Sequence, residues 1–288
     1  MLELLHRAEK FYIHERDIDI PLQKFETLKN FFSGSVFIMA SGASVAEFSV
    51  SKYSSFPFIV MNGSILRFSG TEINPIFYLC SDPDFPEKHP DVAVLGCERS
   101  KNIAMDLRCF NKIYEYDKNA LIGKSLYMLN RVNRYPDRYV KTRIYSDRRF
   151  AWSVQKDTDF VCDFSILNKI QNRIGFSKNM DRGYFCARTI VYPAVQLAYM
   201  MGFKRVYIVG MDLNKQVGRF YEKSGDVAQS YIDDDYVDYI LPSFKFFSER
   251  ILKHEDSFHV FNLSQNSRLP DSILPKISYI QLDELLFQ

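Results

Sequence analysis

Short hydrophobic runs that end in small or polar residues recur along the first eighty positions of the chain. The runs cover residues 36–40, 57–61 and 75–80, and a cluster of Ser, Gly, Asn or Asp follows each one. Uninterrupted apolar runs of this length are typical of strands buried on both faces of a sheet. Segments with helical spacing separate the runs, so the sequence predicts an α/β fold with a mainly parallel sheet covered by helices.

A second regular pattern begins near residue 188. Apolar side chains keep helical spacing over 188–201, with Pro193 inside the first turn and Gly202 directly after the last residue. Proline near a helix start and glycine just past its end are both favourable. The same reasoning predicts the remaining elements: a strand over 205–209 ending in Gly-Met-Asp, a helix near 236–253, a strand over 258–263 and a helix over 280–287.

Two segments are less regular. Residues 1–34 predict an amphipathic helix with apolar side chains on one side, namely Phe25, Leu28, Phe31 and Phe32. Residues 83–160 alternate short apolar pieces with charges. We interpret 120–160 as an inserted lid or membrane-facing region of a single domain that covers residues 1–288.

Composition narrows the class of protein. The chain has 288 residues, of which 47% are hydrophobic and 25% charged, as in ordinary globular proteins. No apolar run approaches the roughly 18 to 20 residues that span a bilayer. The charged N-terminal segment is unlike a signal peptide, so we expect a cytoplasmic protein. Five cysteines without C-x-x-C spacing argue against a disulfide framework and against a zinc site.

One window, residues 131–149, departs from the near-neutral charge balance. It holds seven basic residues against Asp137 and Asp147. It is either a solvated edge strand or helix face, or an electropositive surface for anionic lipids, phosphates or nucleic acid. No DNA- or RNA-binding motif accompanies it, so we expect no nucleic-acid partner.

Candidate binding residues follow the predicted strands. Ligands of open parallel sheets bind at the carboxyl ends of the strands, so these residues are expected at one edge: Ser41, Gly42, Asn62, Gly63, Asp82 and Asp212. The Ser41–Ser44 turn, between a strand and a predicted helix, can cradle a phosphate. The alternative is an ordinary strand-to-helix connection with Ser44 as N-cap.

The motifs, taken in order, resemble a known family. They are FIMASGASVAEF, IVMNGS, YLCSDPDF, RIGFSKNMDRGYFCARTI, GMDLN, GRFYE, ILPSFKFF and VFNLS, spread from about residue 35 to 265. The series resembles the WaaZ-type Kdo transferases of lipopolysaccharide core biosynthesis in Gram-negative bacteria. More distantly it resembles bacterial lipooligosaccharide sialyltransferases, which use CMP-sialic acid and a Rossmann-like GT-A variant fold without a metal.

The resemblance implies a glycosyltransferase that moves Kdo from CMP-Kdo to an inner-core sugar of lipopolysaccharide. The expected partners are a CMP-activated donor and a glycolipid acceptor. The enzyme is expected at the inner face of the inner membrane, in peripheral contact with anionic lipid through residues 131–149. The resemblance also implies that no cofactor or metal is needed. The nearest match to a metal-binding DxD motif, Asp82-Pro83-Asp84, is either an ordinary turn or a metal site.

The resemblance also implies roles for particular residues. Contacts to the donor are expected from Ser41, Gly42 and Ser44 near the phosphate and ribose, Asn62 and Gly63 at the nucleotide or sugar, Thr189 at the phosphate or sugar carboxylate, and Asp212 and Asn214 in the nucleotide pocket. Tyr221 would stabilise the leaving phosphate, with Arg219 nearby. Structural alternatives remain, since Asp212 could cap a helix and Tyr221 could be a core aromatic.

The general base is where the sequence departs from the sialyltransferases. Those enzymes place a histidine between the Gly-Met-Asp strand end and the last strand, but residues 222–240 contain none, and His254 and His259 come later. Asp82 is therefore the first candidate and Glu222 the second; the run Asp233–Asp235 is weaker. Two other functions stay open: a sialyltransferase-like enzyme for another CMP-activated acid sugar, and a non-catalytic binding module in core assembly.

Overall fold

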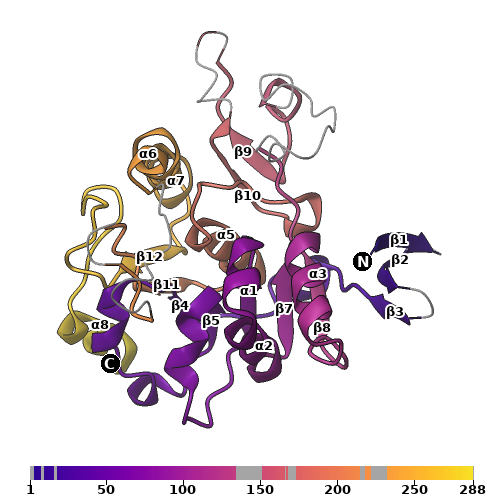
Figure 1. Cartoon of the computed structure of the whole chain (residues 1–288). Coiled ribbons are helices and arrows are strands. Elements are labelled where there is room, and N and C mark those ends of the chain that lie inside the picture. Colours follow the sequence, from indigo (N-terminus) through magenta and orange to yellow (C-terminus); the bar gives the residue numbers. More distant parts are fainter. Residues whose placement is uncertain are drawn as a thin grey trace.

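The computed structural model describes residues 3–7, 10–15, 18–133, 151–165, 167, 173–214, 218–221 and 232–287. Within these residues the strands form three sheets, of seven, three and two strands (Figure 1). Every neighbouring pair in the largest sheet is parallel, which confirms the predicted sheet. In spatial order its strands are β12 (His259–Asn262), β11 (Arg205–Val209), β4 (Ser35–Met39), β5 (Phe58–Met61), β6 (Phe77–Cys80), β7 (Asn102–Met105) and β8 (Ser125–Met128).

Both faces of the large sheet are covered, because successive strand residues point to opposite sides. Val36 and Ile38 pack into one hydrophobic cluster, and Phe37 and Met39 pack into another. Helices α5 (Val191–Met201) and α7 (Leu241–Phe247) complete the first cluster. The second is completed by α2 (Pro90–Arg99), α3 (Leu107–Tyr116) and α8 (Tyr279–Phe287).

The predicted helices and strands of the second half are confirmed. Helix α5 stops at Gly202, whose φ of 96° is the left-handed conformation that glycine tolerates, and the Gly202 N–H caps the last turn. A continuous helical segment begins with α6 (Ile232–Asp235) and includes α7, with one π-helical turn before α7 at Tyr236–Ile240 and another after it at Ser248–Leu252. It corresponds to the helix predicted near 236–253.

The helix predicted over residues 1–34 is wrong. The segment forms an antiparallel sheet of β1 (Glu3–Arg7), β2 (Lys10–Glu15) and β3 (Ile18–Pro21), followed by a 3₁₀ turn at Phe25–Leu28. Alternation of Ile and Asp before a proline favours a strand over a helix. The small sheet projects beyond β8 (Figure 1), and the Gln23 N–H reaches the Leu126 carbonyl at 2.7 Å.

Residues 83–160 contain structure that the sequence pattern did not reveal. Strands β7 and β8 extend the large sheet, and α1 (Asp84–Lys88), α2 and α3 lie along this part of the chain. Asp106 begins α3, since its side chain accepts the N–H groups of Arg108 and Cys109. The proposed insertion at 120–160 thus begins with a sheet strand, while its residues 134–150 lie outside the described part of the chain.

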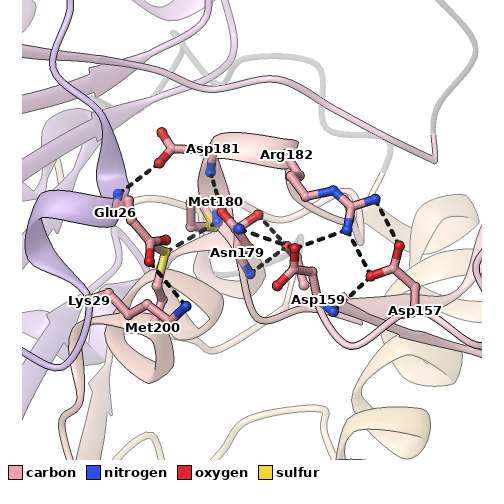
Figure 2. Close-up of polar contacts among 10 residues, drawn as sticks. Glu26, Lys29, Asp157, Asp159, Asn179, Met180, Asp181, Arg182 and Met200 are labelled. Carbon is pink, nitrogen blue, oxygen red and sulfur yellow. Dashed lines mark hydrogen bonds and ion pairs between the residues drawn. The ribbon is translucent and has the colours of Figure 1, made fainter.

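The two-stranded sheet, β9 (Phe160–Cys162) and β10 (Gly175–Ser177), is tied down by charged side chains. Figure 2 shows Arg182 between Asp157 and Asp159, at 2.8 and 2.9 Å. The hydrogen bond from Arg182 lowers the pKa of Asp157. Nearby, the Asp181 carboxylate accepts the N–H groups of Phe25 and Glu26 at 2.8 and 2.7 Å, joining this region to the first turn after β3 (Figure 2).

In the part of the chain that the structure describes, no helix combines the length and the hydrophobicity required to cross a bilayer.

Candidate active site

The strand order of the large sheet reverses between β4 and β11. From β4 the chain adds β5 to β8 on one side, and later β11 and β12 on the other. The crevice outside the carboxyl ends at such a reversal is the usual ligand site of open α/β sheets. Ser41, Asn62, Asp82 and Gly210 follow β4, β5, β6 and β11, so the structure brings the predicted strand-end residues to one edge.

The carboxylate of Asp212 binds the turn after β4. Its Oδ2 accepts the Ser44 N–H at 2.9 Å, and its Oδ1 accepts the Ser44 hydroxyl. The Ser44 hydroxyl also lies 2.9 Å from the hydroxyl of Ser264, just beyond β12. Asp212 is only 9% exposed, so these charge-assisted bonds act where water screens them little. They join the ends of β4, β11 and β12.

Gly42 is required by the close approach of this turn to β11. Its N–H donates to the Gly210 carbonyl at 2.9 Å. A Cβ at position 42 would lie 2.5 Å from that carbonyl oxygen and 2.6 Å from Asp212 Oδ2. Both are well inside van der Waals contact, so any side chain at position 42 would displace Asp212 or the backbone of β11.

The turn after β4 differs from the predicted helix start. It is a short 3₁₀ segment, Ala43–Glu47, with Gly42 rather than Ser44 at the N-cap. The α-helix expected here is therefore wrong, and so is Ser44 as its N-cap. The N–H and hydroxyl of Ser44 already bind the carboxylate of Asp212. A donor phosphate would have to use other groups of the turn or replace Asp212.

Residues 218–221 lie across the ends of β4 and β5. Arg219 forms an isolated antiparallel bridge with Gly42, and the Phe220 N–H donates to the Ser41 carbonyl at 3.1 Å. The ring of Tyr221 covers Gly63 so closely that a Cβ there would lie 2.2 Å from Tyr221 Cε1. Tyr221 and Arg219 are thus placed at the predicted site, although they are far from it in sequence.

Tyr221 belongs to an aromatic group that includes a histidine. Its ring meets the rings of His89 and Phe85 edge-on, with centroids 5.7 and 6.2 Å apart. His89 is half-buried at the junction of α1 and α2. By contrast, His259 is the first residue of β12 and therefore lies at the opposite, amino edge of the sheet.

Several buried polar atoms at the carboxyl edge are left unsatisfied, including Asn262 Nδ2 at the last residue of β12. Within the described residues, Ser41 Oγ and Asn62 Oδ1 have no hydrogen-bond partner. Asn62 also adopts a left-handed φ of 48°, a conformation that asparagine tolerates better than most residues other than glycine. Unpaired buried polar atoms also occur away from this edge, for example at Arg67 and Ser100, so Ser41 and Asn62 are candidate ligand contacts because of their position at the strand ends.

Asp82 has an exposed side chain in the turn that begins α1. Its Oδ1 accepts the Asp84 N–H at 3.2 Å, and its carbonyl accepts the Phe85 N–H at 3.1 Å. The Asp82-Pro83-Asp84 segment therefore forms a hydrogen-bonded turn at the start of α1. Among the described residues, no group of three or more His, Cys, Asp or Glu side chains is arranged to hold a metal ion.

Arg131, counted with the basic surface in the sequence, is instead a largely buried cation. Its side chain is 15% exposed, and its Nε donates to the Tyr184 hydroxyl at 3.0 Å. Its Nη2 donates to the Ser81 carbonyl and lies 3.7 Å from Asp106. Burial raises the pKa of the Tyr184 phenol, which keeps it protonated. The rest of the basic window, from Arg134 to Arg149, lies outside the described residues.

The remaining predicted residues lie at the margins of this site or outside the described chain. Thr189 Oγ1 accepts the Val191 N–H at 3.4 Å at the start of α5, and Asn214 is exposed. The acidic run belongs to α6: Asp233 bonds Arg268 at 2.7 Å, and Asp235 pairs with Arg188 at 3.3 Å. Glu222 and the side chain of Asp234 lie outside the described residues.

Comparison with known families gives the site its context. Residues 12–280 match the family model described as 3-deoxy-D-manno-octulosonic acid transferase WaaZ. The chain belongs to the WaaZ family. A probable 3-deoxy-manno-octulosonic acid transferase of Escherichia coli (strain K12) is 22% identical over 275 residues, covering 95% of this chain and 90% of the relative. One of Salmonella typhimurium is 24% identical over 230 residues, covering 80% and 81%.

A solved structure, the MAf glycosyltransferase from Magnetospirillum magneticum AMB-1, is similar to this WaaZ-family chain with a TM-score of 0.44 and 13% identity. The match covers 86% of this chain and 36% of the other, so the chain spans about a third of that protein's length.

In this WaaZ-family protein, the sequence analysis missed two residues at the carboxyl edge of the large sheet. Ser264 follows β12 as Ser41 follows β4, so the strand-end rule that selected Ser41 would also have selected Ser264. His89 has no comparable signal. It lies between two helices, and only the packing of α1 against the Tyr221 segment brings it to the site.

Proposed function

We propose that this protein transfers Kdo from CMP-Kdo to a sugar of the lipopolysaccharide inner core. The observation that carries the proposal is the meeting of four strand ends at the reversal point of the sheet, in a chain of the WaaZ family. CMP-Kdo as donor follows from the resemblance to enzymes that use CMP-activated acid sugars. The assignment to a GT-A variant fold remains part of the proposal.

Donor binding would use the unsatisfied polar atoms at the carboxyl edge. Ser41 Oγ and Asn62 Oδ1 are covered by protein and unpaired within the described residues. A buried group left without a partner costs about 1 to 3 kcal/mol, which a donor hydroxyl or amino group would recover. The donor would have to displace the side chains above these atoms. Residues 218–221 lie over this edge, so we expect this segment to be displaced when the donor binds.

The transfer would form a bond between an acceptor oxygen and the anomeric carbon of Kdo. The bond from that carbon to the phosphate oxygen breaks, and CMP leaves with the electron pair. Negative charge grows on the phosphate, so hydrogen-bond donors and cations that face it stabilise the transition state. Tyr221 and Arg219 would supply these groups, because their backbone segment lies over the ends of β4 and β5.

A general base must take the proton of the acceptor hydroxyl. Asp82 is the first candidate, because its exposed carboxylate follows β6 at the same edge. Glu222, next to Tyr221 in sequence, is the second. His89 joins them, because its ring packs against that of Tyr221 and an imidazole nitrogen can accept a proton. Comparing kcat against pH for Asp82→Asn and His89→Gln assigns the role, since the variant lacking the base loses the acidic limb of the profile.

Metal-independent transfer at a membrane surface completes the proposal. Activity should persist in excess chelator, because the protein's own hydrogen-bond donors would neutralise the leaving phosphate. The basic window would hold the enzyme near anionic lipid head groups at the inner face of the inner membrane. Loss of activity in chelator, restored by a divalent cation, would contradict the first of these points.

The decisive assay is mass spectrometry of core oligosaccharide after incubation with the protein and CMP-Kdo. The proposal predicts a gain of one Kdo unit and release of CMP. Transfer from CMP-sialic acid but not from CMP-Kdo would favour the sialyltransferase-like alternative. Binding of core oligosaccharide without CMP release from either donor would favour a non-catalytic module.

A further inference from the structure

One largely buried arginine joins the carboxyl ends of three strands that lie away from the strand reversal. Arg131 follows β8, and the backbone beside it pairs with Tyr184, whose carbonyl accepts the Val132 N–H at 3.0 Å. The Arg131 guanidinium donates to the carbonyl of Ser81, directly after β6, and lies 3.7 Å from Asp106, directly after β7. The ends of β6, β7 and β8 thus meet at one cation.

One nitrogen of this guanidinium is left for a ligand. Contacts with Tyr184, Ser81 and Asp106 use Nε and Nη2 of Arg131. Within the described residues, Nη1 donates to no protein atom, and it is not among the unpaired polar atoms that the protein encloses. The N–H groups of Nη1 are therefore open to solvent, on a side chain that is only 15% exposed. Because the protein already fixes its orientation, Nη1 can donate to an oxyanion without losing much further freedom.

Asp106 does not use up the charge of Arg131. Its Oδ1 accepts the N–H groups of Arg108 and Cys109 at the start of α3, at 2.9 and 3.1 Å. Its Oδ2 is 2.9 Å from Arg108 Nη2 but 3.7 Å from Arg131 Nη2. The carboxylate is thus shared between two guanidinium groups, and it lies closer to that of Arg108. Since it faces Nη2 of Arg131, an anion can bind at Nη1 without displacing it.

Arg131 lies within the span of a sugar nucleotide bound at the strand reversal. Neighbouring strands of a sheet are about 4.8 Å apart, so the ends of β6 and β7 lie about 5 and 10 Å from the end of β5. Asp82, the first candidate for the general base, comes directly after the Ser81 carbonyl that Arg131 binds. With the nucleotide over β4 and β5, the reacting sugars would therefore lie over β6 and β7, beside the guanidinium.

We propose that Arg131 positions an acidic sugar substrate by donating from Nη1 to one of its oxyanions. The anion is a carboxylate or a phosphate group, which arginine binds well. CMP-Kdo would supply a carboxylate, and an acidic acceptor oligosaccharide would supply a phosphate or a carboxylate. The inference rests on the proposed function in one respect, since that function brings acidic sugars to this edge.

Calorimetric titrations of the native chain and of Arg131→Gln with CMP, CMP-Kdo and core oligosaccharide separate the two sources. We expect native affinity for CMP and roughly tenfold weaker binding of the ligand that supplies the anion. Weaker binding of CMP-Kdo identifies the donor carboxylate, and weaker binding of the oligosaccharide identifies an acceptor anion. Native affinity for all three ligands would overturn the proposal. An equal loss for CMP would also overturn it, because CMP has no sugar acid.

Arg99→Gln is the matched control for loss of a structural arginine. Arg99 Nη2 donates to the Thr71 and Ile73 carbonyls at 2.6 and 2.9 Å, and Arg99 precedes β7, at the amino edge of the sheet. This variant should lose stability but bind all three ligands like the native chain. Equal weakening of sugar binding by Arg99→Gln and Arg131→Gln would contradict a contact between Arg131 and the ligand.

Altered ligands keep the test independent of how well the variant folds. The native chain is titrated with CMP-Kdo whose carboxylate is converted to a neutral carboxamide, and with core oligosaccharide neutralised in the same way and stripped of phosphate. We expect at least one of them to bind roughly tenfold more weakly than its intact counterpart. If both bind like the intact ligands, the proposal fails even when Arg131→Gln does not fold.

Binding and transfer can fail separately. If the native chain binds an acidic sugar through Arg131 but transfers no Kdo, the proposed function fails and this inference stands. If the native chain transfers Kdo while Arg131→Gln binds every ligand normally, this inference alone fails.

Discussion

Two short 3₁₀ turns in this molecule are each held by an Asp carboxylate from a distant part of the chain, and the two carboxylates differ in burial. At Phe25–Leu28, the carboxylate of Asp181 accepts the first two N–H groups of the turn. At Ala43–Glu47, the carboxylate of Asp212 accepts the N–H and hydroxyl of Ser44. Each carboxylate comes from more than 150 residues further along the chain, at separations of 155 to 168 residues. Asp181, however, is exposed, and Asp212 is buried.

The difference in burial separates a replaceable contact from an indispensable one. When Asp181 is removed, water can satisfy the N–H groups it leaves behind. When Asp212 is removed, the half-buried Ser44 N–H loses its acceptor and the Ser44 hydroxyl keeps only its contact with Ser264, so a partly buried donor is left without a partner. Asp212 also sits where the strand order reverses, so the shape of the proposed donor site depends on it. Asp181 only fastens the region of β9 and β10 to the segment after β3 (Figure 2).

Among the substitutions considered, Asp212→Ala is expected to cause the largest loss of stability. Removing a buried, hydrogen-bonded charge should lower the free energy of unfolding by about 3 kcal/mol. Urea denaturation measures the loss, and Asp212→Asn, which keeps the shape and one acceptor oxygen, should recover part of it. A loss no larger than that of Asp181→Ala would contradict the contrast between the two turns.

A smaller but still clear effect is expected from Gly42→Ala. The added methyl group would lie 2.5 Å from the Gly210 carbonyl oxygen, and relieving this clash should cost about 2 kcal/mol. Gly34→Ala is a matched control for loss of a glycine, because a Cβ there has nothing within 4 Å, although its φ of 71° adds some backbone strain. Urea denaturation should find Gly42→Ala the less stable of the two.

The smallest effect is expected from Asp181→Ala. Loss of a capping carboxylate at an exposed turn costs about 1 kcal/mol. Transfer activity should stay at the native level, since Asp181 lies away from the strand ends that form the candidate site. A drop in kcat with no change in stability would show that the two turns are coupled in a way their positions do not suggest.

The sequence predicted the core of the fold because the buried strands β4, β5, β6 and β11 are continuous apolar runs that end in Gly, Asn or Asp. The same rule placed Gly42, Asn62 and Asp212 at one edge. The first strands were missed because residues 1–34 mix helical and alternating spacing, and the antiparallel pairing of β1 to β3 decided between them. Strands β7 and β8 were missed because polar residues interrupt or flank their short apolar runs.

Contacts between distant residues could not be predicted from local patterns. Nothing near Ser44 indicates that its partner is the carboxylate of Asp212, and nothing near Gly63 indicates that the ring of Tyr221 covers it. The burial of Arg131 could not be predicted for the same reason. It was counted with the basic residues that follow it, but tertiary contacts with Ser81 and Tyr184 draw it into the protein.

Titration of the protein with CMP tests the central claim most directly, because it asks whether the carboxyl edge at the strand reversal binds the nucleotide of the donor. Calorimetry should find that Asn62→Ala weakens CMP binding roughly tenfold, since it removes a polar group at that edge. Asp181→Ala, the substitution at the exposed turn, should bind CMP like the native chain. Native affinity in Asn62→Ala, or an equal loss in both variants, would contradict the placement of the donor site.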